Sequence, residues 1–195
     1  PPIHLSATVG VQQPASRVGI GTGSLKHLAL ALSVAFLLAG CAVDTPVVQA
    51  PTMYADMAVA GAKLDAVAAA TMISQYRQNN GLGMVEVDPE LMRLAESQSQ
   101  AMADKNKLDH DVRAPLAKRL NGAGYDATVA VENVSAGYHT LAEAFSGWRD
   151  SPPHRANMLK TGVTKIGIAA SYAPNTKYKV FWTMILAAPD GKKPS

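Results

Sequence analysis

The sequence predicts an α+β domain in which helices flank a β-sheet. Three observations lead to this fold class. Segments with helical periodicity dominate the chain between residues 63 and 150, and two strand-like segments close it. The second of these, Lys179–Leu186, is a nearly continuous apolar run, which is typical of a central strand covered on both faces. The turn-forming residues Pro174, Asn175 and Thr176 separate the two strands and predict that they pair as a hairpin.

The helices are recognised by their apolar spacing and by signals at their ends. Asp88 can cap a helix that Pro89 begins, and its apolar stripe includes Gln98. Thr140 and Glu143 form a T-x-x-E capping box, and Pro152 is expected to stop the helix that follows. The predicted helices cover about 63–79, 88–102, 114–121 and 140–150. The predicted strands are a short strand or strand-like loop at 129–135, and the hairpin strands 165–172 and 179–186.

An apolar segment with the features of an export signal precedes the domain. Lys26 and His27 lie before a run of roughly a dozen apolar residues, which is shorter than the ~20 residues that a membrane-spanning helix needs. The run ends in Leu38-Ala39-Gly40-Cys41, which resembles the lipobox of bacterial lipoproteins. The resemblance implies that the Cys41 thiol is acylated and becomes the new N-terminus. Cys41 is then a membrane anchor, and two or three acyl chains would hold it stably.

These signals divide the chain into five parts. We expect the true start near Ser24, so that residues 1–24 are a non-native extension or an error in the assigned start. Residues 25–40 are the predicted signal peptide, 41–62 the lipidated cysteine and a flexible tether, 63–190 the folded domain, and 191–195 a tail. Ala42 stands where many Gram-negative inner-membrane lipoproteins have Asp, which slightly favours the outer membrane.

Composition excludes several classes of function. The chain has 18 Lys and Arg against 15 Asp and Glu, and loss of Arg17 and Lys26 with the signal would leave 16 against 15. No basic run interleaved with aromatic residues is present, so we predict no nucleic-acid partner. Cys41 is the single cysteine, which excludes an intramolecular disulfide and paired-cysteine zinc sites.

Three segments, taken in order, resemble the CAP superfamily of cysteine-rich secretory, antigen 5 and pathogenesis-related 1 proteins. The first, Leu91–His110, is a helix leading to a histidine. The second, Val131–Tyr138, reads V-E-N-V-S-A-G-Y and is close to the family's G-E-N-[IVL]-A-x-G-Y. The third, Glu143–Leu159, contains W-R-D-S-P-P-H-R-A-N-M-L and resembles the bacterial W-x-x-S-P-x-H-R-x-N-[IM]-L. The likeness extends over about residues 66–188.

The resemblance implies an α–β–α sandwich with a central antiparallel sheet and a cleft. In many members two histidines and two glutamates line this cleft and can hold a divalent metal such as zinc. His110, Glu132 and His154 match three of these positions. The fourth is open, because Ser151 stands where eukaryotic members often have the second glutamate. Glu143 is a candidate for it, although the capping box offers Glu143 a purely structural role.

Three functions remain in competition at this point. The leading hypothesis is a lipid-anchored cell-envelope module that binds a lipid or a cell-wall component near His110, Glu132 and His154. The rival is a metal-dependent hydrolase in which His110 and His154 hold zinc and Glu132 activates water as general base. The third is a scaffold that presents its loops to a protein partner. The resemblance alone does not choose among them, because one fold serves many functions.

Overall fold

The computed structural model describes residues 50–191. The predicted extension, the signal peptide and the lipidation site Cys41 lie outside this part of the chain, and so does most of the tail. Within residues 50–191, no helix combines the length and the apolar character needed to cross a bilayer.

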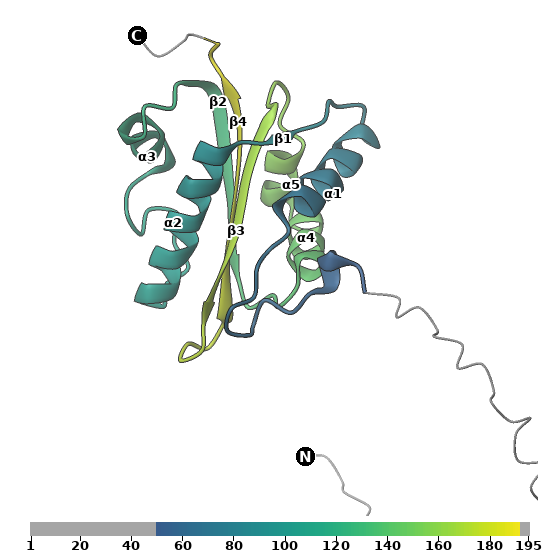
Figure 1. Cartoon of the computed structure of the whole chain (residues 1–195). Coiled ribbons are helices and arrows are strands. Elements are labelled where there is room, and N and C mark those ends of the chain that lie inside the picture. The colour runs from purple at the N-terminus through teal and green to yellow at the C-terminus, as the bar shows by residue number, and fades with distance from the viewer. Residues whose placement is uncertain (1–49, 192–195) are drawn as a thin grey trace, which may run out of the picture. The chain divides into compact units, whose positions relative to one another are not determined.

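Two layers of helices enclose a four-stranded sheet. The strands are β1 (Glu86–Val87), β2 (Ala127–Ala136), β3 (Lys165–Ala173) and β4 (Lys179–Pro189). The helices are α1 (Ala66–Gln78), α2 (Pro89–Lys105), α3 (Leu116–Gly122), α4 (Leu141–Asp150) and α5 (Pro152–Met158). Helices α2 and α3 cover one face of the sheet, and α1, α4 and α5 cover the other (Figure 1). The predicted α–β–α arrangement is therefore confirmed.

The strand order is β1-β3-β4-β2, and β4 pairs with both β3 and β2 in antiparallel register. Every residue of β4 from Val180 to Ala187 is fully buried, which confirms the predicted central strand and its hairpin. The sheet is mixed, however, because β1 runs parallel to β3. The predicted antiparallel pairing therefore holds for β2, β3 and β4, whereas the edge strand β1 departs from it. Only Asp88 separates β1 from α2.

Two boundaries differ from the sequence-based prediction. Pro152 ends α4 as expected, but it also begins α5. Proline suits this position because the N–H groups of the first helical turn have no partner within the helix, so the missing N–H of proline costs nothing there. The predicted tether 41–62 is ordered over its described part. There Met57 is only 5% exposed, and its N–H donates to the His139 carbonyl at 2.7 Å. The packed domain consequently begins before residue 63.

Strand β2 forms the other edge of the sheet, and its alternating side chains reach both helical layers. Val131 packs with the cluster of α1, α4 and α5, whereas Val134 packs with α2 residues such as Met102. Because successive side chains of a strand point to opposite faces, Glu132 faces the α2–α3 layer and Asn133 faces α5. This edge strand is where the predicted site residues meet.

Candidate functional site

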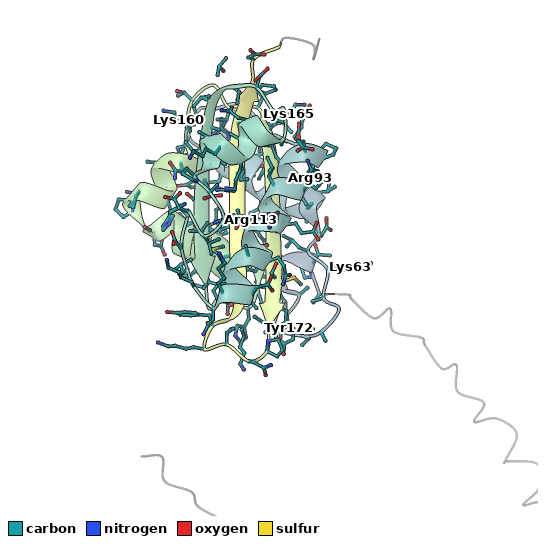
Figure 2. All side chains as sticks on the ribbon, turned by 90° about the vertical axis from the view of Figure 1, so that its left-hand side faces the viewer. Lys63, Arg93, Arg113, Lys160, Lys165 and Tyr172 are labelled. Carbon is teal, nitrogen blue, oxygen red and sulfur yellow. The ribbon has the colours of Figure 1, made fainter. Side chains whose placement is uncertain are left out.

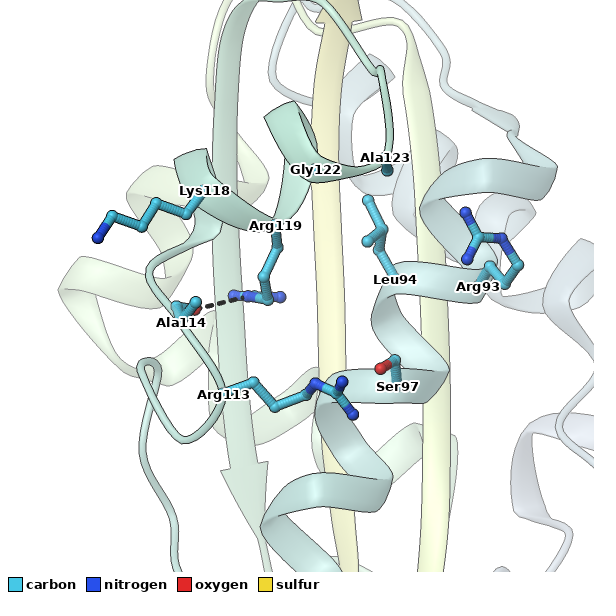
Figure 3. A pocket seen from close by; sticks show the side chains of 9 residues that line it. All are labelled: Arg93, Leu94, Ser97, Arg113, Ala114, Lys118, Arg119, Gly122 and Ala123. Carbon is cyan, nitrogen blue, oxygen red and sulfur yellow. Dashed lines mark hydrogen bonds between the residues drawn. The ribbon is translucent and has the colours of Figure 1, made fainter.

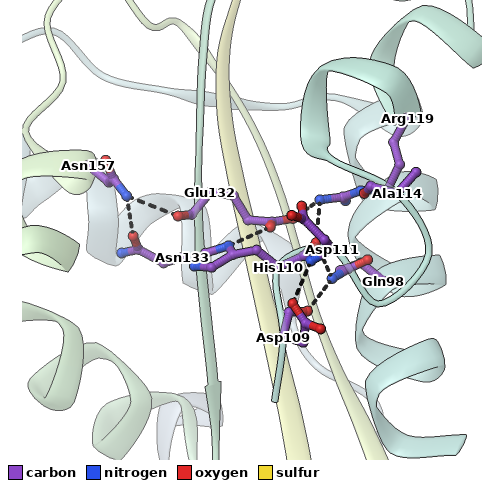
Figure 4. A network of polar contacts seen from close by, with 9 residues as sticks. All are labelled: Gln98, Asp109, His110, Asp111, Ala114, Arg119, Glu132, Asn133 and Asn157. Atoms are coloured by element: carbon purple, nitrogen blue, oxygen red, sulfur yellow. Dashed lines mark hydrogen bonds and ion pairs between the residues drawn. The ribbon is translucent and has the colours of Figure 1, made fainter. Parts of the chain in front are cut away.

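His110 lies in the loop between α2 and α3, and a buried glutamine of α2 holds this loop in place. Nε2 of Gln98 donates to the carbonyl oxygens of Asp109 and His110, each at 2.9 Å (Figure 4). The position of Gln98 in the predicted apolar stripe is confirmed, since it is fully buried. Its amide therefore positions the histidine loop from inside the core.

Glu132 binds two basic side chains at once, those of His110 and Arg119. Its Oε1 lies 2.8 Å from Nδ1 of His110, and its Oε2 accepts from Nη2 of Arg119 at 2.6 Å (Figure 4). The side chains of Glu132 and Arg119 are only 4% and 6% exposed, whereas His110 is 55% exposed. The hydrogen bond that His110 donates to Glu132 raises the pKa of His110 above its usual value, against the opposing effect of burial. Glu132 thus anchors an imidazole whose other edge faces solvent.

Arg119 was missed in the sequence analysis, although a signal for it exists. Leu116, Arg119 and Leu120 fall on one helical face, and the two leucines pack in the core beneath α3. A charged residue on an apolar helical face needs a buried partner. In this chain Glu132 is that partner.

A second set of hydrogen bonds fastens α5 to the edge strand. Asn133 donates through Nδ2 to the His154 carbonyl oxygen at 3.0 Å. Asn157 donates through Nδ2 to the Glu132 carbonyl oxygen and to Oδ1 of Asn133, each at 2.9 Å (Figure 4). The E-N and H-R-x-N segments noted in the sequence are therefore joined by their asparagines, which fix the helix that carries His154.

Among residues 50–191, the side chain of His154 is hydrogen-bonded to a hydroxyl group and to no carboxylate. Nδ1 of His154 lies 2.9 Å from Oγ of Ser151, the residue that precedes α5. Burial lowers the pKa of His154, and the charge of His110 lowers it further. The two imidazoles are therefore within electrostatic range of each other, and the shifts of their pKa values are opposite in sign. Ser151, at the position of the second glutamate in eukaryotic members, contacts this histidine.

Glu143 does not join these residues. Its Oε2 accepts from the N–H groups of His139 at 2.7 Å and Thr140 at 3.0 Å, while Thr140 Oγ1 accepts from the N–H of Glu143. The capping box predicted from the sequence is confirmed. Glu143 lines a hollow with residues such as Ser146 and Asp150, and none of His110, Glu132 and His154 lines it.

The residues present do not fit a metal centre with three protein ligands. Among residues 50–191, no group of three His, Cys, Asp or Glu side chains is arranged to hold a metal ion. Both carboxylate oxygens of Glu132 already bind protein donors, and Arg119 would repel a cation beside them. Zinc binding by His110 and His154 stays a prediction.

Comparison with known proteins is consistent with this geometry. The model of the cysteine-rich secretory protein family, CAP, matches residues 70–186. The uncharacterized protein YkwD of Bacillus subtilis is 34% identical over 95 residues, which make up 47% of this chain and 37% of that protein. The match therefore spans well under half of the length of that relative.

Two solved structures share the fold. An extracellular protein containing a SCP domain from Bacillus anthracis superposes with a TM-score of 0.54 and 24% identity, over 62% of this chain and 39% of that one. An outer surface protein of Borrelia burgdorferi superposes with a TM-score of 0.59 and 18% identity, over 66% of this chain and 95% of that one. Because the family model covers more than half of the sequence, the chain belongs to the CAP family of cysteine-rich secretory proteins.

Proposed function

We propose that this chain is a binding module of the cell envelope that presents His110 and His154 to a polar ligand, a lipid or a cell-wall component. One observation carries the proposal. Glu132 is buried and both of its carboxylate oxygens are hydrogen-bonded to protein side chains, so it is not free to activate water. A hydrolase with Glu132 as general base would first have to break these contacts.

The two histidines complement each other as recognition groups. The raised pKa of His110 favours an imidazolium, which donates hydrogen bonds to anionic or carbonyl oxygens. The lowered pKa of His154 favours a neutral imidazole, which can accept as well as donate. A ligand with both acceptors and donors, such as a peptide-bearing wall fragment, suits this pair.

Ligand binding is tested by the stability of the full chain in the presence of muropeptides or anionic lipids. A ligand at 100 times its Kd stabilises its protein by about 2.7 kcal/mol, and we expect such a gain for at least one of these classes. His110→Gln and His154→Gln should abolish the gain, while His139→Gln, outside the hydrogen bonds of His110 and His154, should keep it. The proposal fails if no compound stabilises the wild-type chain.

The hydrolase hypothesis predicts a different outcome from the same proteins. An enzyme that uses His110 and His154 as zinc ligands would lose both its metal and its turnover in His154→Ala. A binding module would lose ligand-dependent stabilisation with no change in metal content. Metal analysis of the wild-type chain after mild purification, beside the His154→Ala variant, separates the two.

The proposed location of the module in the cell envelope rests on the lipobox-like segment that ends at Cys41. Relatives in the fold comparison are described as extracellular or as an outer surface protein, which supports an extracytoplasmic location for this chain. We expect Cys41→Ser to move the protein from the membrane fraction to the soluble fraction and to remove acyl chains detectable by mass spectrometry. A wild-type protein with an unmodified Cys41 would disprove the anchor.

A further inference from the structure

A basic hollow lies between α2 and α3, on the face turned toward the viewer in Figure 2, where Arg113 is exposed. Its volume is about 380 Å³, within the range of small-ligand sites. No described residue that lines it is acidic, although acidic side chains lie close to it. The residues that line it are Arg93, Leu94, Ser97, Arg113, Ala114, Lys118, Arg119, Gly122 and Ala123.

Arg119 gives the hollow a buried cationic wall. Its Nε donates to the Ala114 carbonyl at 2.9 Å and its Nη2 donates to Glu132, but its Nη1 is buried and has no acceptor in the described part of the chain. A buried donor without an acceptor is unfavourable. An anion in this hollow would bring negative charge and acceptor oxygens to the side of the guanidinium that Glu132 leaves unused.

The other cationic side chains that line the hollow differ in whether they are paired with an acidic residue. Arg113 and Lys118 make no ion pair or side-chain hydrogen bond with any residue from 50 to 191. Arg93 is paired with Glu90 and is therefore partly neutralised. In Figure 3 the guanidinium of Arg113 extends toward Ser97 on α2, while Lys118 points outward from α3. Arg113 and Arg119 are thus the inner cations, and Lys118 belongs to the rim.

Four acidic residues lie close to this arrangement: Glu90 pairs with Arg93, Glu132 pairs with Arg119, and two others line an adjoining hollow. Glu96 and Asp104 line it together with Arg93, Ser97 and Arg113, and neither of them lines the hollow of Arg119. No described residue that lines the hollow of Arg119 is acidic, although Glu132 pairs with Arg119 from the other side. Of the lining cations, Arg113 and Lys118 are therefore the two without an ion pair among residues 50–191.

We propose that this hollow binds a phosphate group, either free or as part of a lipid headgroup. Arginine guanidinium groups match the geometry of phosphate oxygens in two-pronged contacts, and the Ser97 hydroxyl adds a neutral donor. The site is separate from the one proposed above, because neither His110 nor His154 lines the hollow. The two sites share only Arg119, which holds Glu132 on one side and the hollow on the other.

The test uses the full chain and inorganic pyrophosphate, with binding measured by calorimetric titration. We expect saturable binding by the wild type and roughly tenfold weaker binding by the double variant Arg113→Gln/Lys118→Gln, which corresponds to about 1.4 kcal/mol. Both side chains are exposed, so the variant should keep its thermal midpoint. The matched control Lys63→Gln/Arg155→Gln loses the same charge at exposed positions outside the hollow and should bind within about twofold of the wild type.

Two results would overturn the proposal. One is the absence of saturable pyrophosphate binding by the wild type, and the other is an equal loss in the hollow variant and the control, which would indicate attraction to net charge alone. A second titration distinguishes a soluble phosphate from a lipid headgroup. It uses dihexanoyl phosphatidylglycerol and dihexanoyl phosphatidylcholine below their micelle concentrations. A lipid site binds the first in competition with pyrophosphate, whereas a site for soluble phosphates binds pyrophosphate alone.

Discussion

Replacing Arg77 with methionine is expected to lower the free energy of unfolding by about 3–5 kcal/mol, because buried carbonyl groups would lose a charged donor. The side chain of Arg77 lies in the last turn of α1 and is 1% exposed. Burial lowers its pKa, and within the described part of the chain its guanidinium donates to four carbonyl groups. These are the carbonyl oxygens of Gly83 at 2.9 Å, Met158 and Lys160 at 2.8 Å, and Val163 at 3.3 Å.

The effect should be concentrated at the end of α5, because Met158 and Lys160 lie there. Urea unfolding measures the loss of stability, and amide hydrogen exchange locates it. Arg155→Met is the matched control, since Arg155 is exposed and its side-chain hydrogen bond among residues 50–191 is a long one, 3.5 Å to the Arg149 carbonyl. We expect it to change stability by no more than about 0.5 kcal/mol. Equal stabilities of the two variants would mean that water replaces the guanidinium.

Features of the fold that depend on neighbouring residues could be predicted from the sequence. The cap at Asp88 and the capping box of Thr140 and Glu143 both form as expected, because each needs only residues three or fewer positions away. The end of α4 was predicted from Pro152, but α5 was missed, because the same proline that disrupts the helix before it also suits the first turn of the next one. The two-residue strand β1 was missed because the alternation of Val85, Glu86 and Val87 is too short to predict a strand.

The candidate site could be predicted only in part, because its contacts join residues far apart in the chain. The resemblance to the family indicated His110, Glu132 and His154, but it gave no account of what holds them. Arg119 binds Glu132 across 13 positions, and Arg77 reaches Val163 across 86. Spacing along the sequence does not specify such pairs. They appear only when the helices are packed on the sheet.

Replacing Arg119 with methionine is expected to cost about 3–5 kcal/mol of stability above neutral pH, because it leaves the buried Glu132 carboxylate without its main cation. Removing the carboxylate as well, in Arg119→Met/Glu132→Gln, should recover part of this loss, since the unpaired charge is then gone. Urea unfolding of the wild type, both single variants and the double variant yields the coupling energy. A double variant as unstable as the sum of the singles would show that the two side chains act independently.

The loss in Arg119→Met should also depend on pH, with a sign fixed by His110. The charge of Arg119 lowers the pKa of His110, so its removal should raise that pKa further above the ordinary value of 6.5. A group with a raised pKa in the folded state stabilises the protein fully below its unfolded pKa, and this contribution is lost as pH rises through the folded pKa. The loss of stability in Arg119→Met should therefore be smaller at about pH 5.5, where the His110 imidazolium is the cation that remains beside Glu132, than at about pH 8.5.

The control is His110→Gln in the same background, which should remove the difference between the two pH values. A deficit independent of pH would mean that His110 and Glu132 are not paired in solution, and the proposed recognition by His110 would then lose its basis.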